Sequence, residues 1–143
     1  MNINWFGQAC FRIEAKDIKI LIDPFNKDLG LKVPRINDDI ILVTHDHDDH
    51  NNIKEVEKSI FVVRGPGEYE RSEVQIVGIQ SFHDNEEGAK RGLNTIYIIK
   101  VEGVRICHLG DLGQHALTDE QVETIGEVDI LMIPVGEIGR AHV

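Results

Sequence analysis

Six consecutive residues, His45-Asp46-His47-Asp48-Asp49-His50, constrain this chain more than any other segment. They follow residues 40–43, an apolar run that predicts a short buried strand ending at Thr44. The loop after this strand would present imidazole and carboxylate groups, which are ordinary ligands of zinc and of similar divalent metals. The segment therefore predicts a metal site on a strand-end loop. The alternative is a solvated acidic loop that happens to contain histidines.

The rest of the chain is rich in short runs that predict strands, many of them separated by turn residues. These runs cover residues 2–6, 10–14, 18–22, 40–43, 60–63, 74–79, 95–101, 105–108 and 130–134. Only residues 52–58 and 118–125 are helical in pattern, and Thr118 with Gln121 resembles a capping box at the start of the second. Residues 65–70 are interpreted as a glycine-rich turn. The pattern indicates one β-rich α/β domain.

Composition argues against several classes of function. The net charge of −10 leaves no basic patch for nucleic acid or for an anionic membrane. No stretch approaches the ~20 apolar residues of a membrane span, and no signal-peptide pattern is present at the N-terminus. Cys10 and Cys107 lie far apart in apolar surroundings, which predicts free buried thiols and no disulfide. These features together predict a reduced, cytoplasmic setting.

The pattern His-x-His-x-Asp-His resembles the metal-binding motif of the metallo-β-lactamase superfamily. The resemblance implies an αββα sandwich, here incomplete at the C-terminus, with two metals at one edge between the sheets. It also implies that His45 and His47 share one metal and that Asp49 and His50 serve the second.

Three further residues match other motifs of that superfamily. Asp23, after the apolar run at 20–22, would hold the metal-binding loop through hydrogen bonds without touching metal. His83 would complete the first metal site, and Asp111 would bridge the two metals. Asp49 and Asp111 are then the expected catalytic residues. Taken alone, each of Asp23, His83 and Asp111 could be an ordinary turn or surface residue.

Several short segments resemble one group within the superfamily, the small metal-dependent hydrolases related to the ascorbate-6-phosphate lactonase branch. The matching segments are Trp5-Phe6-Gly7, Leu21-Ile22-Asp23-Pro24-Phe25, Gly65-Pro66-Gly67-Glu68-Tyr69, Ser81-Phe82-His83-Asp84 and Gly110-Asp111-Leu112-Gly113. Members of that group often carry His-Ser where this chain has Gln8-Ala9, so a polar role at those two positions does not carry over.

The resemblance implies a dinuclear zinc hydrolase that uses a metal-bound hydroxide on a small ester, lactone or phosphodiester, with Mn²⁺ or Fe as other candidate metals. One alternative is a di-iron redox or oxygen-handling protein on the same fold, although such relatives place glutamate where this chain has His47. The other is a metal-binding fragment without activity. A small-molecule substrate is expected, but the sequence predicts neither its identity nor the oligomeric state.

The last residues of the chain do not fit this picture. The hydrolase domain is expected to span residues 1–136, and a final metal-binding histidine would lie beyond the end of this chain. His142 is too close to the last predicted strand to be that ligand. Residues 137–143 can be encoded by GAG ATC GGA AGA GCA CAC GTC, which after its first base is a widely used sequencing-adapter sequence. We therefore expect residues 137–143 to be a non-native tail.

Overall fold

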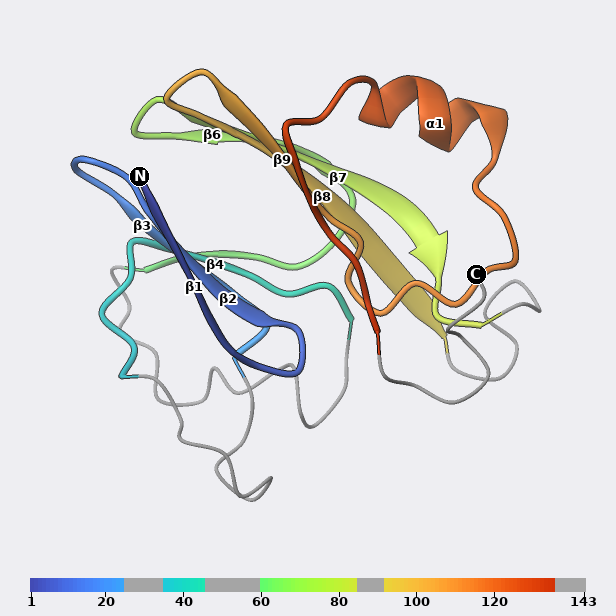
Figure 1. The fold of residues 1–143 in the computed structure, drawn as a ribbon, viewed down its shortest axis with the longest axis horizontal. Helices are drawn as coiled ribbons and strands as arrows, with labels where there is room; N and C mark the ends of the chain where they lie inside the picture. Colours follow the sequence, from blue (N-terminus) through green and yellow to red (C-terminus); the bar gives the residue numbers. More distant parts are fainter. Residues whose placement is uncertain (25–34, 46–59, 85–91, 136–143) are drawn as a thin grey trace. The chain divides into compact units, whose positions relative to one another are not determined.

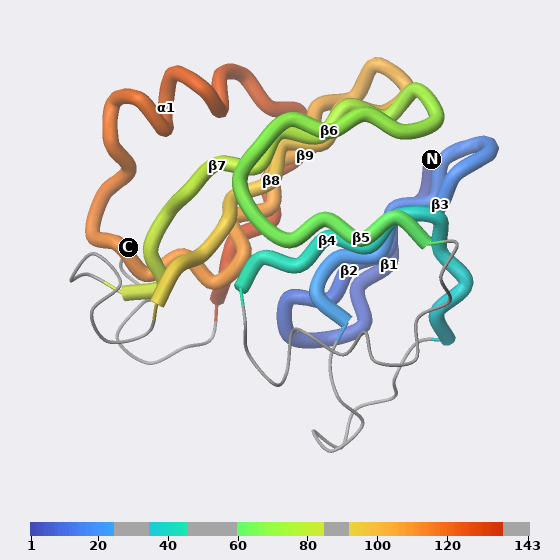
Figure 2. The backbone as a smooth tube through the Cα atoms, turned by 180° about the vertical axis from the view of Figure 1, so that it is seen from behind, coloured from blue at the N-terminus to red at the C-terminus, as the bar shows by residue number. Residues whose placement is uncertain are grey.

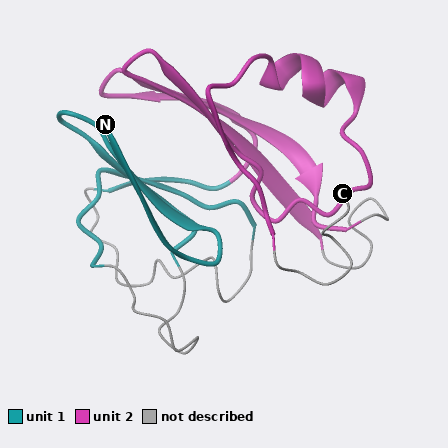
Figure 3. Cartoon of the chain, viewed as in Figure 1, with its two compact units in different colours: residues 1–64 teal, residues 65–143 magenta. Residues whose placement is uncertain are grey.

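The structure is a computed structural model that describes residues 1–24, 35–45, 60–84 and 92–135. The chain divides into two compact units, residues 1–64 and residues 65–143 (Figure 3). Each unit contains one five-stranded sheet. Among the described residues, no helix has the length and apolar content that crossing a membrane requires.

The sheet of the first unit follows the order of the sequence (Figure 1). Its strands are β1 (Asn2–Gly7), β2 (Cys10–Glu14), β3 (Lys19–Ile22), β4 (Ile40–Leu42) and β5 (Phe61–Val63). The first three strands pair antiparallel, whereas β3, β4 and β5 pair parallel. Parallel pairing brings the carboxyl ends of β3 and β4 to the same edge of the sheet, because Ile22 pairs with Leu42.

The two central strands of this sheet are the most buried part of the unit. All the apolar residues of β3 and β4 are fully buried, and Leu21 and Ile41 pack with Cys10 and Val43 in one cluster. Continuous apolar runs of this kind are typical of parallel strands. The residues that follow β3 and β4 are therefore held by a rigid base.

The second unit has the strand order β10-β9-β8-β7-β6. Its strands are β6 (Gly67–Arg71), β7 (Val74–Phe82), β8 (Leu93–Val101), β9 (Val104–His108) and β10 (Ile130–Met132). Strands β6 to β9 are antiparallel neighbours, visible side by side in Figure 2, and β10 pairs parallel with β9. The ends of β7 and β9 therefore lie at the same end of the sheet, because both run antiparallel to β8.

The helix α1 (Asp119–Ile125) lies between β9 and β10 in sequence. Thr118 caps it with both hydrogen bonds of a capping box, so this sequence prediction is confirmed. The Gln121 side chain also donates to the Gln80 carbonyl at 2.9 Å, which ties the start of the helix to β7. At the other end of the helix, Ile125 packs with Ile96, Ile98, Cys107, Leu109 and Leu112.

The predicted strands are all present, with small shifts at their ends, and the structure adds one. Residues 67–71 form β6, whereas the sequence indicated a glycine-rich turn at 65–70. The prediction was wrong because β6 is an edge strand with mostly exposed side chains, so it lacks the alternation of apolar and polar residues that marks a half-buried strand. The expected helix at 52–58 lies outside the described residues.

Candidate metal centre

Asp23 and Thr44 join the ends of the two buried parallel strands. Asp23 follows β3, is fully buried and has a φ of 50°. Its Oδ1 accepts a hydrogen bond from the Thr44 amide at 2.8 Å, and its Oδ2 accepts one from the Thr44 hydroxyl at 2.5 Å. The Asp23 amide in turn donates to the Leu42 carbonyl at 2.9 Å. Hydrogen bonds to an ionised acceptor are strong, so the start of the loop after β4 is fixed in place.

The Thr44 hydroxyl also fixes the orientation and tautomer of His45. Its Oγ1 lies 2.8 Å from Nδ1 of His45, whose side chain is buried. A hydroxyl has a single proton, and this one is donated to the Asp23 carboxylate. The hydroxyl must therefore accept from Nδ1–H of His45. This hydrogen-bond pattern assigns the proton to Nδ1 and leaves Nε2 with the lone pair that a metal requires.

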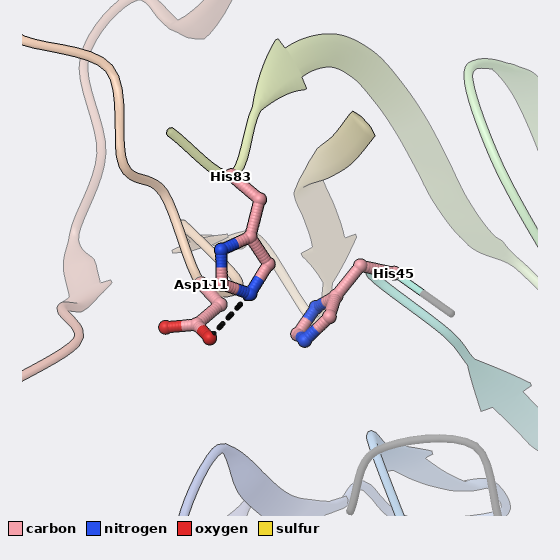
Figure 4. A group of neighbouring side chains, drawn as sticks. All are labelled: His45, His83 and Asp111. Carbon is pink, nitrogen blue, oxygen red and sulfur yellow. Dashed lines mark ion pairs between the residues drawn. The ribbon is translucent and has the colours of Figure 1, made fainter. Parts of the chain in front are cut away.

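His83 and Asp111 form a buried pair in the second unit. His83 follows β7 and Asp111 follows β9, and Nε2 of His83 lies 2.7 Å from Oδ2 of Asp111 (Figure 4). The two residues are only 2% and 8% exposed. A buried carboxylate is costly without a partner, and here the imidazole provides one. The His83 amide donates to the Gly92 carbonyl at 3.0 Å, which holds its backbone in position.

The loop after β9 approaches the His83 backbone closely. The Gly113 amide donates to the Phe82 carbonyl at 2.9 Å. A Cβ atom at Gly113 would lie 2.1 Å from the carbonyl oxygen of His83, so no side chain fits there. Gly110 has a φ of 65°, a conformation that glycine adopts without strain. Gly110 therefore permits the turn before Asp111, and Gly113 permits the close approach to the His83 backbone.

Asn94 is a contact of Asp111 that the sequence did not reveal. It lies in β8, one residue before the predicted strand at residues 95–101, and is 1% exposed. The Asp111 amide donates to its side-chain oxygen at 3.0 Å. A lone asparagine favours a turn on average, and only the antiparallel pairing of β8 places this one in the core.

The predicted site residues fall into three sets. Asp23 and His45 lie at the strand ends of the first unit, and His83 and Asp111 are brought together in the second. The remaining predicted ligands, His47, Asp49 and His50, lie outside the described residues.

The described side chains fit a metal by their chemistry. His45, His83 and Asp111 are each buried, and each offers one ligand atom. Imidazole nitrogens and carboxylate oxygens are ligand types that suit zinc and related divalent ions. A dication would also offset the buried negative charge of Asp111.

The cysteines do not compete for such a role. Cys10 and Cys107 are free and buried, as predicted. Burial raises the pKa of the Cys10 thiol to about 12 and that of the Cys107 thiol to about 11. Both thiols are therefore protonated at neutral pH, whereas metal binding and nucleophilic attack both require the thiolate.

Comparison with known proteins settles the family. The β-lactamase superfamily domain matches residues 2–142. The chain belongs to this superfamily. A UPF0173 metal-dependent hydrolase of Pyrococcus furiosus is 29% identical over 164 residues, a match that covers 95% of this chain and 72% of that protein. The predicted superfamily and its sandwich fold are thereby confirmed.

Solved structures of other proteins share this fold. A candidate Zn-dependent hydrolase from Thermotoga maritima is 35% identical, with a TM-score of 0.66 over 90% of this chain. This chain spans 58% of that protein. A diiron β-hydroxylase from Streptomyces venezuelae has a TM-score of 0.65 over 90% of this chain at 17% identity, a likeness that shows the fold alone.

Proposed function

We propose that this protein is a dinuclear, zinc-type hydrolase of a small ester, lactone or phosphodiester. In this proposal His45, His47 and His83 hold the first metal. Asp49 and His50 hold the second, and Asp111 bridges the two. The observation that carries the proposal is the buried pair of His83 and Asp111, whose ligand atoms lie 2.7 Å apart at the ends of two strands.

Three features of the described residues support this assignment. The Asp23–Thr44–His45 hydrogen bonds leave Nε2 of His45 with its lone pair. Burial of Asp111 strengthens its attraction to a cation, because charges interact more strongly where water is excluded. The hydrogen bonds from the Thr44 amide to Asp23 and from the Asp111 amide to Asn94 hold the backbone at these loops in advance, so little ordering is needed when a metal binds.

A bound zinc ion would supply Lewis acidity and an ionised water near neutral pH. The protein residues have a separate task. Asp111 contributes negative charge, the histidines contribute neutral nitrogen ligands, and Asp49 is the second proposed catalytic carboxylate. The names of the Pyrococcus and Thermotoga relatives, a metal-dependent hydrolase and a candidate Zn-dependent hydrolase, favour hydrolysis over the di-iron alternative. His47, at a position where di-iron relatives place glutamate, favours the same choice.

Metal titration tests the proposal. The chain, freed of metal by chelation, is titrated with Zn²⁺ and with Co²⁺, whose visible spectrum reports the type of ligands. Asp111→Asn should weaken every bound ion, because an amide lacks the negative charge that offsets two dications. The matched control is His115→Ala, since His115 is exposed on the loop before α1. A chain that binds no metal, or an Asp111→Asn variant with unchanged affinity, would contradict the proposal. Iron retained after purification together with a charge-transfer band would favour the di-iron alternative.

A further inference from the structure

We propose that Asn94 is a positioning residue for Asp111. A side chain near the start of the central strand β8 would then control metal affinity. This inference rests on the proposed function, because it takes Asp111 as a ligand. It concerns a residue that none of the metal-binding motifs contains.

The Asn94 side chain uses all its hydrogen-bonding groups within the second unit. Its Oδ1 accepts from the Asp111 amide at 3.0 Å, and its Nδ2 donates to the Leu109 carbonyl at 2.9 Å. The other proton of Nδ2 is donated to Oγ of Ser81 at 2.9 Å. The Ser81 hydroxyl donates in turn to the Asn94 carbonyl at 3.0 Å. One amide therefore connects β7, β8 and the segment that carries Asp111.

The contacts to Leu109 and Asp111 resemble those of a neighbouring strand. A side-chain amide presents an acceptor and a donor side by side, as the backbone of a strand does. Here the donor pairs with the Leu109 carbonyl and the acceptor with the Asp111 amide, on either side of Gly110. The chain has left β9 at this point, so no strand supplies these bonds. Asn94 thus extends the pairing between β8 and β9 beyond the last strand residue.

Burial makes this support difficult to replace. Asn94 is 1% exposed and Ser81 is fully buried, so bulk water does not reach the groups that Asn94 satisfies. Removing the Asn94 side-chain amide would leave the Leu109 carbonyl and the Asp111 amide without this partner. The cost of an unsatisfied buried group favours conformations in which residues 109–111 move away from β8. Gly110, with its φ of 65°, gives the segment the freedom to move. Asp111 would then lose its fixed position beside His83.

The test compares Asn94→Ala with Ser81→Ala in the full chain. Ser81→Ala removes a bond of the same network but leaves both bonds from Asn94 to Leu109 and Asp111 intact. Two quantities are measured for each variant. The first is the hydrogen-exchange rate of the Asp111 amide in the metal-free protein, and the second is the affinity for Zn²⁺ and Co²⁺. Thermal unfolding shows how far each variant is destabilised.

Asn94→Ala should speed hydrogen exchange of the Asp111 amide about tenfold or more. A tenfold change corresponds to a decrease of about 1.4 kcal/mol in the free energy of the opening that exposes this amide. It should weaken metal binding by about 10- to 100-fold, as expected for a partner that orients a ligand. Ser81→Ala should lower the unfolding temperature but keep the slow Asp111 exchange and the metal affinity of the unmodified chain.

The outcomes separate this inference from the proposed function. If the unmodified chain binds no metal, the proposed function fails, whatever the exchange rates show. If it binds metal and Asn94→Ala binds it equally well, the positioning role is wrong. An equal loss of affinity in both variants would assign the effect to general destabilisation and would also overturn the inference. If Asn94→Ala does not fold, hydrogen exchange of the Asn94 side-chain amide protons is measured in the unmodified chain. Fast exchange of these protons would contradict their hydrogen bonds to Leu109 and Ser81 and would overturn the inference.

Discussion

At the scale of residues, the hydrogen-bond partners of the ligands carry information that the sequence motifs do not. The position of Asp23 after a buried strand was predictable, because an apolar run followed by Asp-Pro marks a strand end. The role of Thr44 was not, because its hydroxyl meets Asp23 only in the register that pairs Ile22 with Leu42. Asn94 was missed for the same reason, since its partners lie on β7 and in the segment after β9.

Thr44→Val tests the residue that connects Asp23 with His45. Valine keeps the shape of threonine but removes the hydroxyl, so His45 loses the acceptor that holds its proton on Nδ1. We expect metal affinity to fall about 10- to 100-fold and the free energy of unfolding to fall by about 1–3 kcal/mol. Thr44→Ser, which keeps the hydroxyl, should bind metal almost as well as the unmodified chain. Equal metal affinity in the two variants, measured by titration, would show that the hydroxyl does not orient His45.

At the scale of elements, the sequence predicted where strands occur better than how far they extend. Strands β7 and β8 both continue to the residues beside the site, at Phe82 and Leu93, because they pair with each other along eight residues of each strand. The close approach of the loop after β9 depends on Gly113, which the sequence shows only as the last residue of the segment Gly110-Asp111-Leu112-Gly113. The contact that excludes a side chain there is with the backbone of His83.

Gly113→Ala tests this approach. The added Cβ would meet the His83 carbonyl oxygen at 2.1 Å, so the two backbone segments must move apart. We expect a loss of about 1–3 kcal/mol in unfolding free energy together with weaker metal binding, because His83 and Asp111 lie on those segments. Gly103→Ala is the control, since it strains the turn between β8 and β9, where φ is 76°, but meets no neighbouring atom. If both variants lose stability and neither loses metal affinity, the packing at Gly113 has no part in the site.

At the scale of the whole molecule, composition and periodicity alone predicted a β-rich α/β domain. The motif from His45 to His50 also predicted the superfamily, because its spacing of histidines and aspartates resembles the metal-binding motif of that superfamily. The family comparison confirms this prediction. What remained unpredictable is the part played by Thr44 and Asn94, since each has a hydrogen-bond partner far away in the sequence. The expected non-native tail at residues 137–143 stays a prediction, which amplifying the gene afresh from its source would test.

The central proposal is that His45, His83 and Asp111 bind the same metal ion. Diffraction from crystals of the chain grown with Zn²⁺, recorded on both sides of the zinc absorption edge, locates zinc atoms directly. We predict an anomalous peak within coordination distance of Nε2 of His45, of His83 and of a carboxylate oxygen of Asp111, about 2.0–2.2 Å from each. Zinc found only at surface residues, or bound to His83 and Asp111 without His45, would contradict it.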